Sequence, residues 1–230
     1  MNDLVTLDAI TAAQKRIAGV ALRTPLVWWP QSQADDALYL KAENLQPIGS
    51  FKLRGAYNLI ASLTPAERKR GVIAHSSGNH AQGVAYAARA LGAKATIVLP
   101  NTAPRIKVEA TRALGAEIVI SGPDSADRIA ECSRLAAAHG YIEVPPYNHR
   151  NIIAGTGTIG LEILEDMPDC GLVLSPISGG GLISGVAAAV KLRMPDCKVV
   201  GVEPGSAPSG EPGQSAVRRH SSIGRFAWWM

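Results

Sequence analysis

The chain has 230 residues, of which 47% are hydrophobic and 18% are charged, and its 23 basic and 19 acidic residues give a net charge of +4. A chain of this length and composition can bury a substantial core and lies far from the composition of disordered proteins. Its apolar runs stay short of the ~18 residues of a membrane-spanning helix. We expect no secretory signal. The sequence contains no basic helix face with interleaved aromatic residues, so we do not expect nucleic-acid binding.

Short apolar segments alternate with alanine-rich stretches along the chain. The apolar segments, which we expect to form strands, are residues 38–41, 71–74, 95–99, 116–120, 172–174 and 198–202. The alanine-rich stretches, which we expect to form helices, are residues 79–91, 104–114, 125–139, 151–165 and 180–192. Several strands are apolar on both faces, as in a parallel sheet covered by helices, so the pattern predicts an α/β fold with right-handed crossovers.

Glycine and proline mark the ends of several expected helices. Gly92, Gly115 and Gly140 each follow a helix and predict its C-terminal end, because glycine readily adopts the left-handed conformation needed there. Pro104 suits the first turn of a helix, where its missing N–H is no loss.

The three cysteines, Cys132, Cys170 and Cys197, share no C-x-x-C spacing. This spacing argues against a disulfide framework and against a zinc site. Free thiols fit a reducing compartment, so we expect a cytoplasmic protein.

Lys52 has the most informative surroundings in the chain. It opens an expected helix behind a Gly-Ser turn, in the segment Pro-Ile-Gly-Ser-Phe-Lys-Leu-Arg-Gly-Ala-Tyr-Asn at residues 47–58, and it follows Phe51, one of only two phenylalanines. A single lysine is usually a solvated surface charge. A lysine in apolar surroundings loses its proton more easily and can act as a nucleophile or base.

A polar loop, Ser-Ser-Gly-Asn-His at residues 76–80, lies between an expected strand and an expected helix. In open α/β sheets, ligands bind beyond the carboxyl ends of the strands, where such loops lie. Backbone N–H groups at the helix N-terminus favour an anion there. The same residue types also cap helices, so both interpretations stay open. His80 alone is more typical of a packed or capping histidine.

A glycine-rich loop, Ser-Gly-Gly-Gly-Leu at residues 178–182, follows another expected strand and opens the last expected helix. Its glycines allow close approach to a phosphate at the helix N-terminus. No Gly-Lys-Ser/Thr follows, so it is not a Walker loop. Gly179 and Gly181 with Glu203 approach a dinucleotide fingerprint, but Ser184 replaces its third glycine. The loop therefore indicates phosphate, and a nucleotide-binding oxidoreductase remains an alternative.

Residues 152–159, Ile-Ile-Ala-Gly-Thr-Gly-Thr-Ile, place small side chains along an expected helix. They could lie tightly below a cofactor. We favour close packing against a neighbouring helix as the interpretation of this stretch.

The order of these segments is more specific than any one of them. Ser-Phe-Lys-x-Arg-Gly-Ala, Ser-Ser-Gly-Asn-His-Ala-Gln-Gly, Ala-Gly-Thr-Gly-Thr and Ser-Gly-Gly-Gly-Leu follow one another along the chain. From about residue 20 to about residue 208, this arrangement resembles the pyridoxal-phosphate-dependent serine/threonine dehydratases, which share the tryptophan-synthase-β-like fold. The resemblance implies two α/β domains of open twisted sheets. Residues 71–148 would form a small inserted domain, and residues 1–70 and 149–208 a larger one that is incomplete at its C-terminus.

The resemblance also implies how pyridoxal 5′-phosphate is held. Lys52 would be the Schiff-base lysine, Phe51 would pack beside the cofactor ring, and Asn79 would hydrogen-bond the pyridoxal 3′-oxygen. The phosphate would be cradled by the backbone of Ser178, Gly179, Gly180, Gly181 and Leu182. In such enzymes the cofactor is the electron sink, and the protein supplies position and electrostatics.

The implied substrate is a small amino acid, and the implied reaction is α,β-elimination that converts L-threonine or L-serine to a 2-oxo acid and ammonia. Ser76, Ser77, Asn79 and His80 would bind the substrate. Lys52 would remove the α-proton, and Ser77 could exchange a proton on the opposite face, which would racemise serine instead. The choice among threonine, serine and 3-hydroxyaspartate stays open. The resemblance further implies a homodimer.

The end of the chain departs from the family pattern. Family members that bind a divalent cation have a second acid a few residues beyond the position of Glu203, where this chain has Ser209, so we expect no strong metal site. Residues 209–230 form an irregular tail that resembles no family segment, and we expect a truncated or frame-shifted end. An inactive remnant that binds pyridoxal phosphate without turnover is therefore a further alternative.

Overall fold

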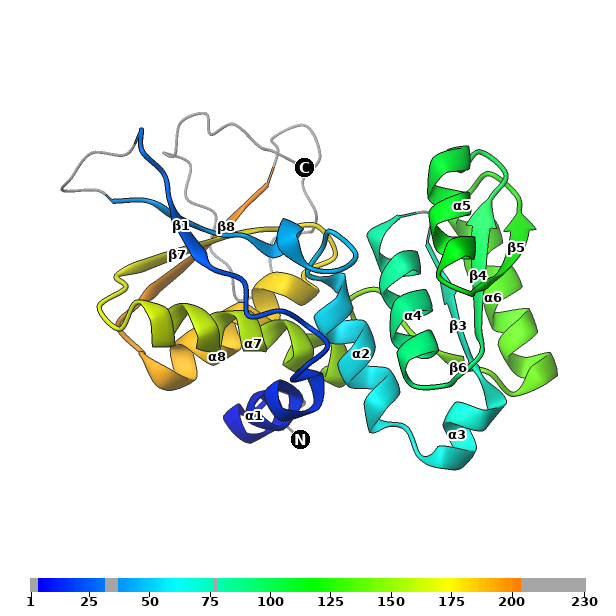
Figure 1. Cartoon of the computed structure of the whole chain (residues 1–230), viewed down its shortest axis with the longest axis horizontal. Coiled ribbons are helices and arrows are strands. Elements are labelled where there is room, and N and C mark those ends of the chain that lie inside the picture. The colour runs from blue at the N-terminus through cyan, green and yellow to red at the C-terminus, as the bar shows by residue number, and fades with distance from the viewer. Residues whose placement is uncertain (1–3, 32–36, 77, 204–230) are drawn as a thin grey trace.

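The computed structural model describes residues 4–31, 37–76 and 78–203 (Figure 1). Predictions that concern Ser77 and residues 209–230 lie outside these described residues. The helices are α1 Leu7–Ile17, α2 Lys52–Ser62, α3 Pro65–Arg70, α4 Asn79–Ala90, α5 Arg105–Ala113, α6 Ser125–His139, α7 Arg150–Asp166 and α8 Gly181–Arg193, with a 3-10 helix η2 at Glu43–Leu45. The strands are β1 Leu26–Trp28, β2 Tyr39–Lys41, β3 Val72–His75, β4 Ala95–Pro100, β5 Glu117–Ser121, β6 Ile142–Glu143, β7 Leu172–Pro176 and β8 Lys198–Val202.

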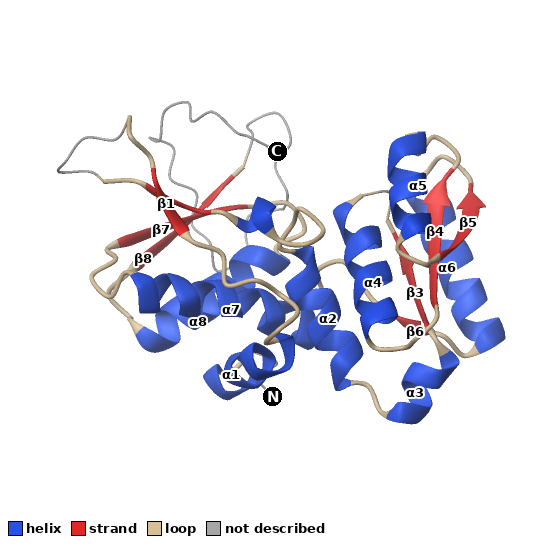
Figure 2. Ribbon diagram, in the orientation of Figure 1, coloured by secondary structure: helices blue, strands red, loops and turns tan. Residues whose placement is uncertain are grey.

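A four-stranded parallel sheet in the order β5-β4-β3-β6 occupies one side of the molecule (Figure 2). Alternate residues of its strands face opposite ways, as the pleat requires. In β3, Val72 and Ala74 pack in the same cluster as Val84 of α4, whereas Ile73 packs with Cys132 of α6. Helices therefore cover both faces of this sheet, which explains why its strands are apolar on both sides.

The other side of the molecule holds two smaller sheets and the helices α1, α7 and α8 (Figure 1). Strands β7 and β8 pair in parallel, so that β7, α8 and β8 form a βαβ unit. Strands β1 and β2 pair antiparallel, with Leu26 opposite Lys41. The expected strand at residues 38–41 is thus present, but it belongs to an antiparallel hairpin and not to a parallel sheet.

Helix α2 lies between these two groups of elements, next to α4 on one side and α7 on the other (Figure 1). Both contacts are possible because a glycine, which has no side chain, lies at each point of closest approach. A Cβ at Gly83 of α4 would lie 3.2 Å from the carbonyl oxygen of Lys52, and one at Gly155 of α7 would lie 2.6 Å from the carbonyl oxygen of Arg54. The first turn of α2 is therefore packed against backbone from both sides.

The expected helix ends are largely confirmed. Gly92, Gly115 and Gly140 all have left-handed backbone, with φ of 65°, 90° and 69°. Pro104 is the N-cap of α5 and not a first-turn residue, because its ψ of 133° is extended. The four-stranded sheet lies within residues 71–148, and the division of the chain into two domains stays a prediction. Among the described residues, no helix has both the length and the apolarity to cross a membrane.

Candidate functional site

Lys52 is the first residue of α2, and it is partly buried. Its backbone N–H donates to the hydroxyl of the buried Ser50 (3.3 Å), and Phe51 is the N-cap of the helix. The Nζ donates to the carbonyl oxygen of Pro146 (2.6 Å) and lies 5.3 Å from the centroid of the Phe51 ring. Burial disfavours the charged form and lowers the pKa of Lys52 from 10.5 to about 8. The amine is thus poised to lose its proton near neutral pH.

His80 lies in the first turn of α4 and is buried, with 3% of its surface exposed. Its Nε2 is 2.8 Å from the carbonyl oxygen of Val144. Burial lowers the pKa of His80 to about 4, and the positive charge of Lys52 adds to this effect. The ring is therefore neutral at pH 7, and because a carbonyl can only accept, its Nε2 carries the hydrogen.

The remaining residues of the loop between β3 and α4 lie beside His80. Asn79 is the first residue of α4 and is exposed, so its amide is accessible. Ser76 ends the loop on the strand side, where its hydroxyl accepts from the backbone N–H of Gly78 (3.3 Å). Ser77 lies outside the described residues. The structure thus brings Asn79 and His80 together and uses Ser76 to shape the turn.

The glycine-rich loop joins the end of β7 to the start of α8. Ser178 and Gly179 are exposed, Gly180 is the N-cap of α8 with a left-handed φ of 81°, and Gly181 is its first residue. Leu182 packs against the cluster beneath the β7–β8 sheet. In the described part of the chain no side chain caps α8. Among the described residues, the first N–H groups of this 13-residue helix therefore have no capping side chain, and a helix N-terminus of this kind favours an anion.

Residues 144–147, Val-Pro-Pro-Tyr, connect these separate parts. The Val144 carbonyl accepts from His80 and the Pro146 carbonyl accepts from Lys52. Tyr147 lies against the glycine loop. A Cβ at Gly179 would lie 2.2 Å from the Tyr147 ring, and one at Gly181 would lie 2.8 Å from the Tyr147 Cβ. This 144–147 segment was not singled out by the sequence pattern, whose only hint was two adjacent prolines that favour an extended backbone.

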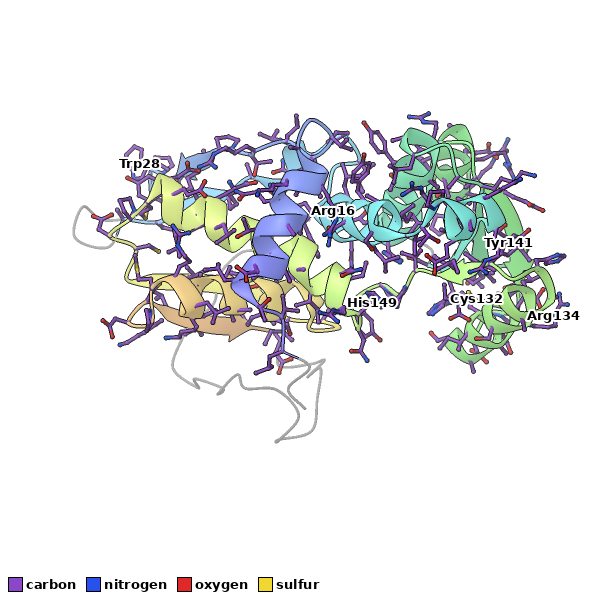
Figure 3. The ribbon with its side chains drawn as sticks, turned by 90° about the horizontal axis from the view of Figure 1, so that it is seen from below. Arg16, Trp28, Cys132, Arg134, Tyr141 and His149 are labelled. Carbon is purple, nitrogen blue, oxygen red and sulfur yellow. The ribbon has the colours of Figure 1, made fainter. Side chains whose placement is uncertain are left out.

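The chain after this segment enters α7 through His149, which is labelled in Figure 3. His149 is the N-cap of α7, and its Nδ1 accepts from the backbone N–H of Asn151 (3.1 Å). Burial lowers the pKa of His149, so the lone pair that accepts this hydrogen bond stays available at neutral pH. The cap fixes where α7 begins, three residues after Tyr147, which contacts the glycine loop.

The small residues at 152–159 pack closely against neighbouring helices, which confirms the favoured interpretation of that stretch. Gly155 lies on the backbone of α2, and a Cβ at Gly157 would lie 2.9 Å from the Ile10 side chain of α1. The Thr156 hydroxyl donates to the carbonyl oxygen of Gly181 (2.8 Å). Helix α7 thereby holds both the lysine helix and the start of α8.

These residues fit a group that carries a carbonyl and a phosphate. The partly buried amine of Lys52 supplies the nucleophile for the carbonyl, and the uncapped N-terminus of α8 supplies the anion site. Both flank the same short segment, because Pro146 contacts the lysine and Tyr147 contacts the glycine loop. Among the described residues, no three His, Cys, Asp or Glu side chains gather as metal ligands.

Comparison with known proteins gives a consistent result. Residues 17–222 match the family described as "Pyridoxal-phosphate dependent enzyme". The chain is 48% identical over 208 residues to the L-threonine ammonia-lyase of Thermotoga maritima, covering 90% of this chain and 52% of the relative. It is 42% identical over 229 residues to the catabolic L-threonine dehydratase TdcB of Escherichia coli K12, covering 97% of this chain and 69% of the relative.

A solved structure, that of maize serine racemase, superposes with a TM-score of 0.85 at 40% identity, covering 87% of this chain and 62% of the racemase. The chain thus spans between about half and about two thirds of the proteins it matches. The fold is that of the tryptophan-synthase-β-like enzymes, and the match to this family leaves the dinucleotide interpretation of Gly179, Gly181 and Glu203 without support. The chain therefore belongs to the family of pyridoxal-phosphate-dependent enzymes.

Proposed function

We propose that this chain is a pyridoxal-phosphate-dependent ammonia-lyase that acts on L-threonine or L-serine. The products are the 2-oxo acid and ammonia, formed by loss of the α-proton and the β-hydroxyl as water and by a later hydrolysis. The observation that carries the proposal is the Lys52 amine, partly buried and held at the Pro146 carbonyl with a lowered pKa, next to the segment that also contacts the glycine loop. The similarity to two threonine-deaminating enzymes supports the choice of substrate.

Lys52 has two tasks in this proposal, as the attachment point of the cofactor and as the base that takes the α-proton. At pH 7.5, a pKa of about 8 leaves roughly a quarter of the amine neutral, against about 0.1% for a lysine with the usual 10.5. The carbonyl of Pro146 can hold the amine when it is protonated. When bound, pyridoxal phosphate supplies the electron sink that makes the α-carbon acidic enough for this transfer.

The other residues of the site hold the cofactor and orient the substrate. We assign the phosphate to the backbone of Ser178, Gly179, Gly180, Gly181 and Leu182. The N-terminus of α8, which no described side chain caps, supports this assignment. Phe51 packs beside the ring, and Asn79, exposed at the start of α4, hydrogen-bonds the 3′-oxygen. The substrate carboxylate lies at the loop between β3 and α4, with Ser76, Ser77, Asn79 and His80. A neutral His80 there contributes no charge and keeps the wall of the site fixed to Val144.

Racemisation of serine is a second candidate, favoured by the likeness to maize serine racemase. It needs a second acid–base group on the face opposite Lys52, and we assign that role to Ser77. Elimination and racemisation begin with the same proton transfer, so both activities can coexist in one site.

The proposal extends to the compartment, the subunit number and the domain division of the enzyme. We place it in the cytoplasm as a homodimer, with residues 71–148 as a small domain inserted into a larger one. Three free, buried cysteines support a reducing compartment. The confinement of the four-stranded sheet to β3 through β6 supports the domain division.

The test is a turnover assay with L-threonine and with L-serine, each in the presence of pyridoxal phosphate. The account predicts 2-oxobutanoate from threonine, pyruvate from serine, and no product from a Lys52→Ala protein. Chiral chromatography of the remaining serine measures racemisation in the same sample. Formation of 2-oxo acid by Lys52→Ala at the parent rate would refute the assignment of Lys52.

A further inference from the structure

Arg54 lies two residues after Lys52 in the first turn of α2, and its side chain is completely buried. Its guanidinium holds two carboxylates in forked pairs. The Nε and Nη2 donate to the two oxygens of Glu43 (both 2.8 Å), and the Nη1 and Nη2 donate to the two oxygens of Glu162 (2.6 and 2.9 Å). Forked pairs of this kind fix the orientation as well as the distance of the groups they join.

A second cation completes the arrangement. The Nζ of Lys41 lies 2.7 Å from an oxygen of Glu162 and donates to the carbonyl oxygen of Thr24 (2.6 Å). The side chains of Lys41 and Glu162 are only 8% and 6% exposed. Lys41, Glu43, Arg54 and Glu162 therefore form a buried ion cluster, and Lys41 also lies 3.8 Å from the carboxylate of the partly exposed Asp166.

Stability alone is a weak reason for such a cluster. Removing four charged groups from water is costly, and well-packed apolar side chains of similar size are often at least as stabilising. The cluster instead fixes the relative positions of the elements that carry it, because each forked pair can form in only one arrangement of its two side chains. The pKa of Lys52 is lowered by burial and not by a charge of the cluster, so the influence of the cluster on the amine is structural.

The ion cluster joins the pieces that fix the position of Lys52. Glu43 belongs to η2, just before the turn that leads into α2, and Glu162 belongs to α7. The carbonyl of Arg54 itself rests on Gly155 of α7, while α4 packs on the carbonyl of Lys52 from the other side. The turn that carries the amine is thus held by ion pairs on the side of α7 and by backbone contact on both sides.

We propose that Arg54 is a positioning residue, which holds the first turn of α2 through Glu43 and Glu162 so that the Lys52 amine stays in its partly buried place at the Pro146 carbonyl. The inference rests on the proposed role of Lys52 and adds the part of the fold that keeps this amine ready to react. His80 of α4 is close enough to feel the charge of Lys52, and its ring is neutral. Burial is then the property of Lys52 that the ion cluster maintains.

The test uses the double variant Arg54→Met/Glu43→Gln in the full chain. It removes one positive and one negative group together, so that the pair of Lys41 and Glu162 remains balanced. The folded protein, without cofactor, is acetylated with acetic anhydride over a range of pH, and mass spectrometry of the Lys52 peptide gives the pKa of this amine from the labelling rates. The matched control is Arg112→Met/Glu109→Gln, which removes an exposed ion pair of α5.

In the double variant the pKa of Lys52 should rise by at least one unit from about 8 toward 10.5, because the released turn admits water to the amine. The control variant should keep the parent value. A folded double variant whose Lys52 keeps a pKa of about 8 would overturn the proposal. If the double variant does not fold, Arg54→Lys, which keeps the charge and loses the forks, is measured in the same way and must show the same rise. Because labelling needs neither cofactor nor substrate, an inactive chain still gives a decisive result for Arg54.

Discussion

Replacing Gly155 by alanine tests how tightly the lysine helix is held against α7. The added Cβ would lie 2.6 Å from the Arg54 carbonyl oxygen, 2.7 Å from the Gly55 Cα and 2.9 Å from the Arg54 carbonyl carbon. All three are backbone atoms, which cannot move aside as a flexible side chain can. One of the two helices must therefore shift, and because Arg54 shares a turn with Lys52, the shift reaches the site.

Two opposing effects set the magnitude. Overpacking of a tight core costs about 1–3 kcal/mol, and contact with three backbone atoms places Gly155 at the upper end of that range. Alanine in place of a helical glycine returns about 1 kcal/mol of helix propensity. The net expectation is a loss of about 2 kcal/mol in the free energy of unfolding, or roughly 4–8 °C in Tm for a protein of this size.

Urea unfolding followed by circular dichroism measures the change. The matched control is Gly171→Ala, because a Cβ at Gly171 meets no atom within 4 Å and its backbone is not left-handed. This control should stay within about 0.5 kcal/mol of the parent. A Gly155→Ala protein as stable as the parent, or more stable, would show that helix propensity prevails and that α2 and α7 are not in close contact.

Three further predictions concern the site itself. Tyr147→Ala removes the ring that lies on Gly179 and should weaken the binding of pyridoxal phosphate about tenfold, or ~1.4 kcal/mol, in a fluorescence titration. Tyr147→Phe, which keeps the ring, should bind the cofactor like the parent. If Tyr147→Ala and Tyr147→Phe bind it with equal affinity, the ring has no role. The pKa of His80 is lower in the folded protein than in the unfolded chain. The free energy of unfolding should therefore fall as the pH drops from 6.5 to about 4, by at most roughly 3 kcal/mol. His80→Gln should flatten this part of the pH profile. The pKa of Lys52 is lower too, so the unfolded chain binds more protons between pH 8 and 10.5, and stability should rise with pH in that window for the parent but less for Lys52→Met.

Local pattern was sufficient for most of the secondary structure. Strands β3, β4 and β5 and the helices ended by glycine were all found. The first two strands are apolar and buried, and left-handed glycines mark the helix ends. The elements that were missed include β1 and β6, which have three and two residues, too few to show a period. Helix α1 was also missed, although its buried residues Ile10, Ala13 and Ile17 follow a helical spacing.

The site was only partly accessible to the same reasoning. Lys52 and the two loops stand out because glycine, serine and a helix-initial lysine are unusual together. The contacts that make a site of them connect distant parts of the chain, since Lys52 meets Pro146 and Arg54 meets Glu162 across 94 and 108 positions. Neither Pro146 nor Glu162 carries a local signal of its partner, because tertiary packing alone brings them together. The low pKa of Lys52 has the same origin, since it arises from burial and not from an adjacent charge.

The most direct test of the account is the covalent capture of pyridoxal phosphate by Lys52. The purified chain is mixed with the cofactor, its visible spectrum is recorded, and borohydride is added before peptide mapping by mass spectrometry. The account predicts a visible absorption band that disappears on reduction and leaves a pyridoxyl group on the peptide that contains Lys52. A folded chain that shows no band, or that carries the label on other lysines while Lys52 is unmodified, would contradict it.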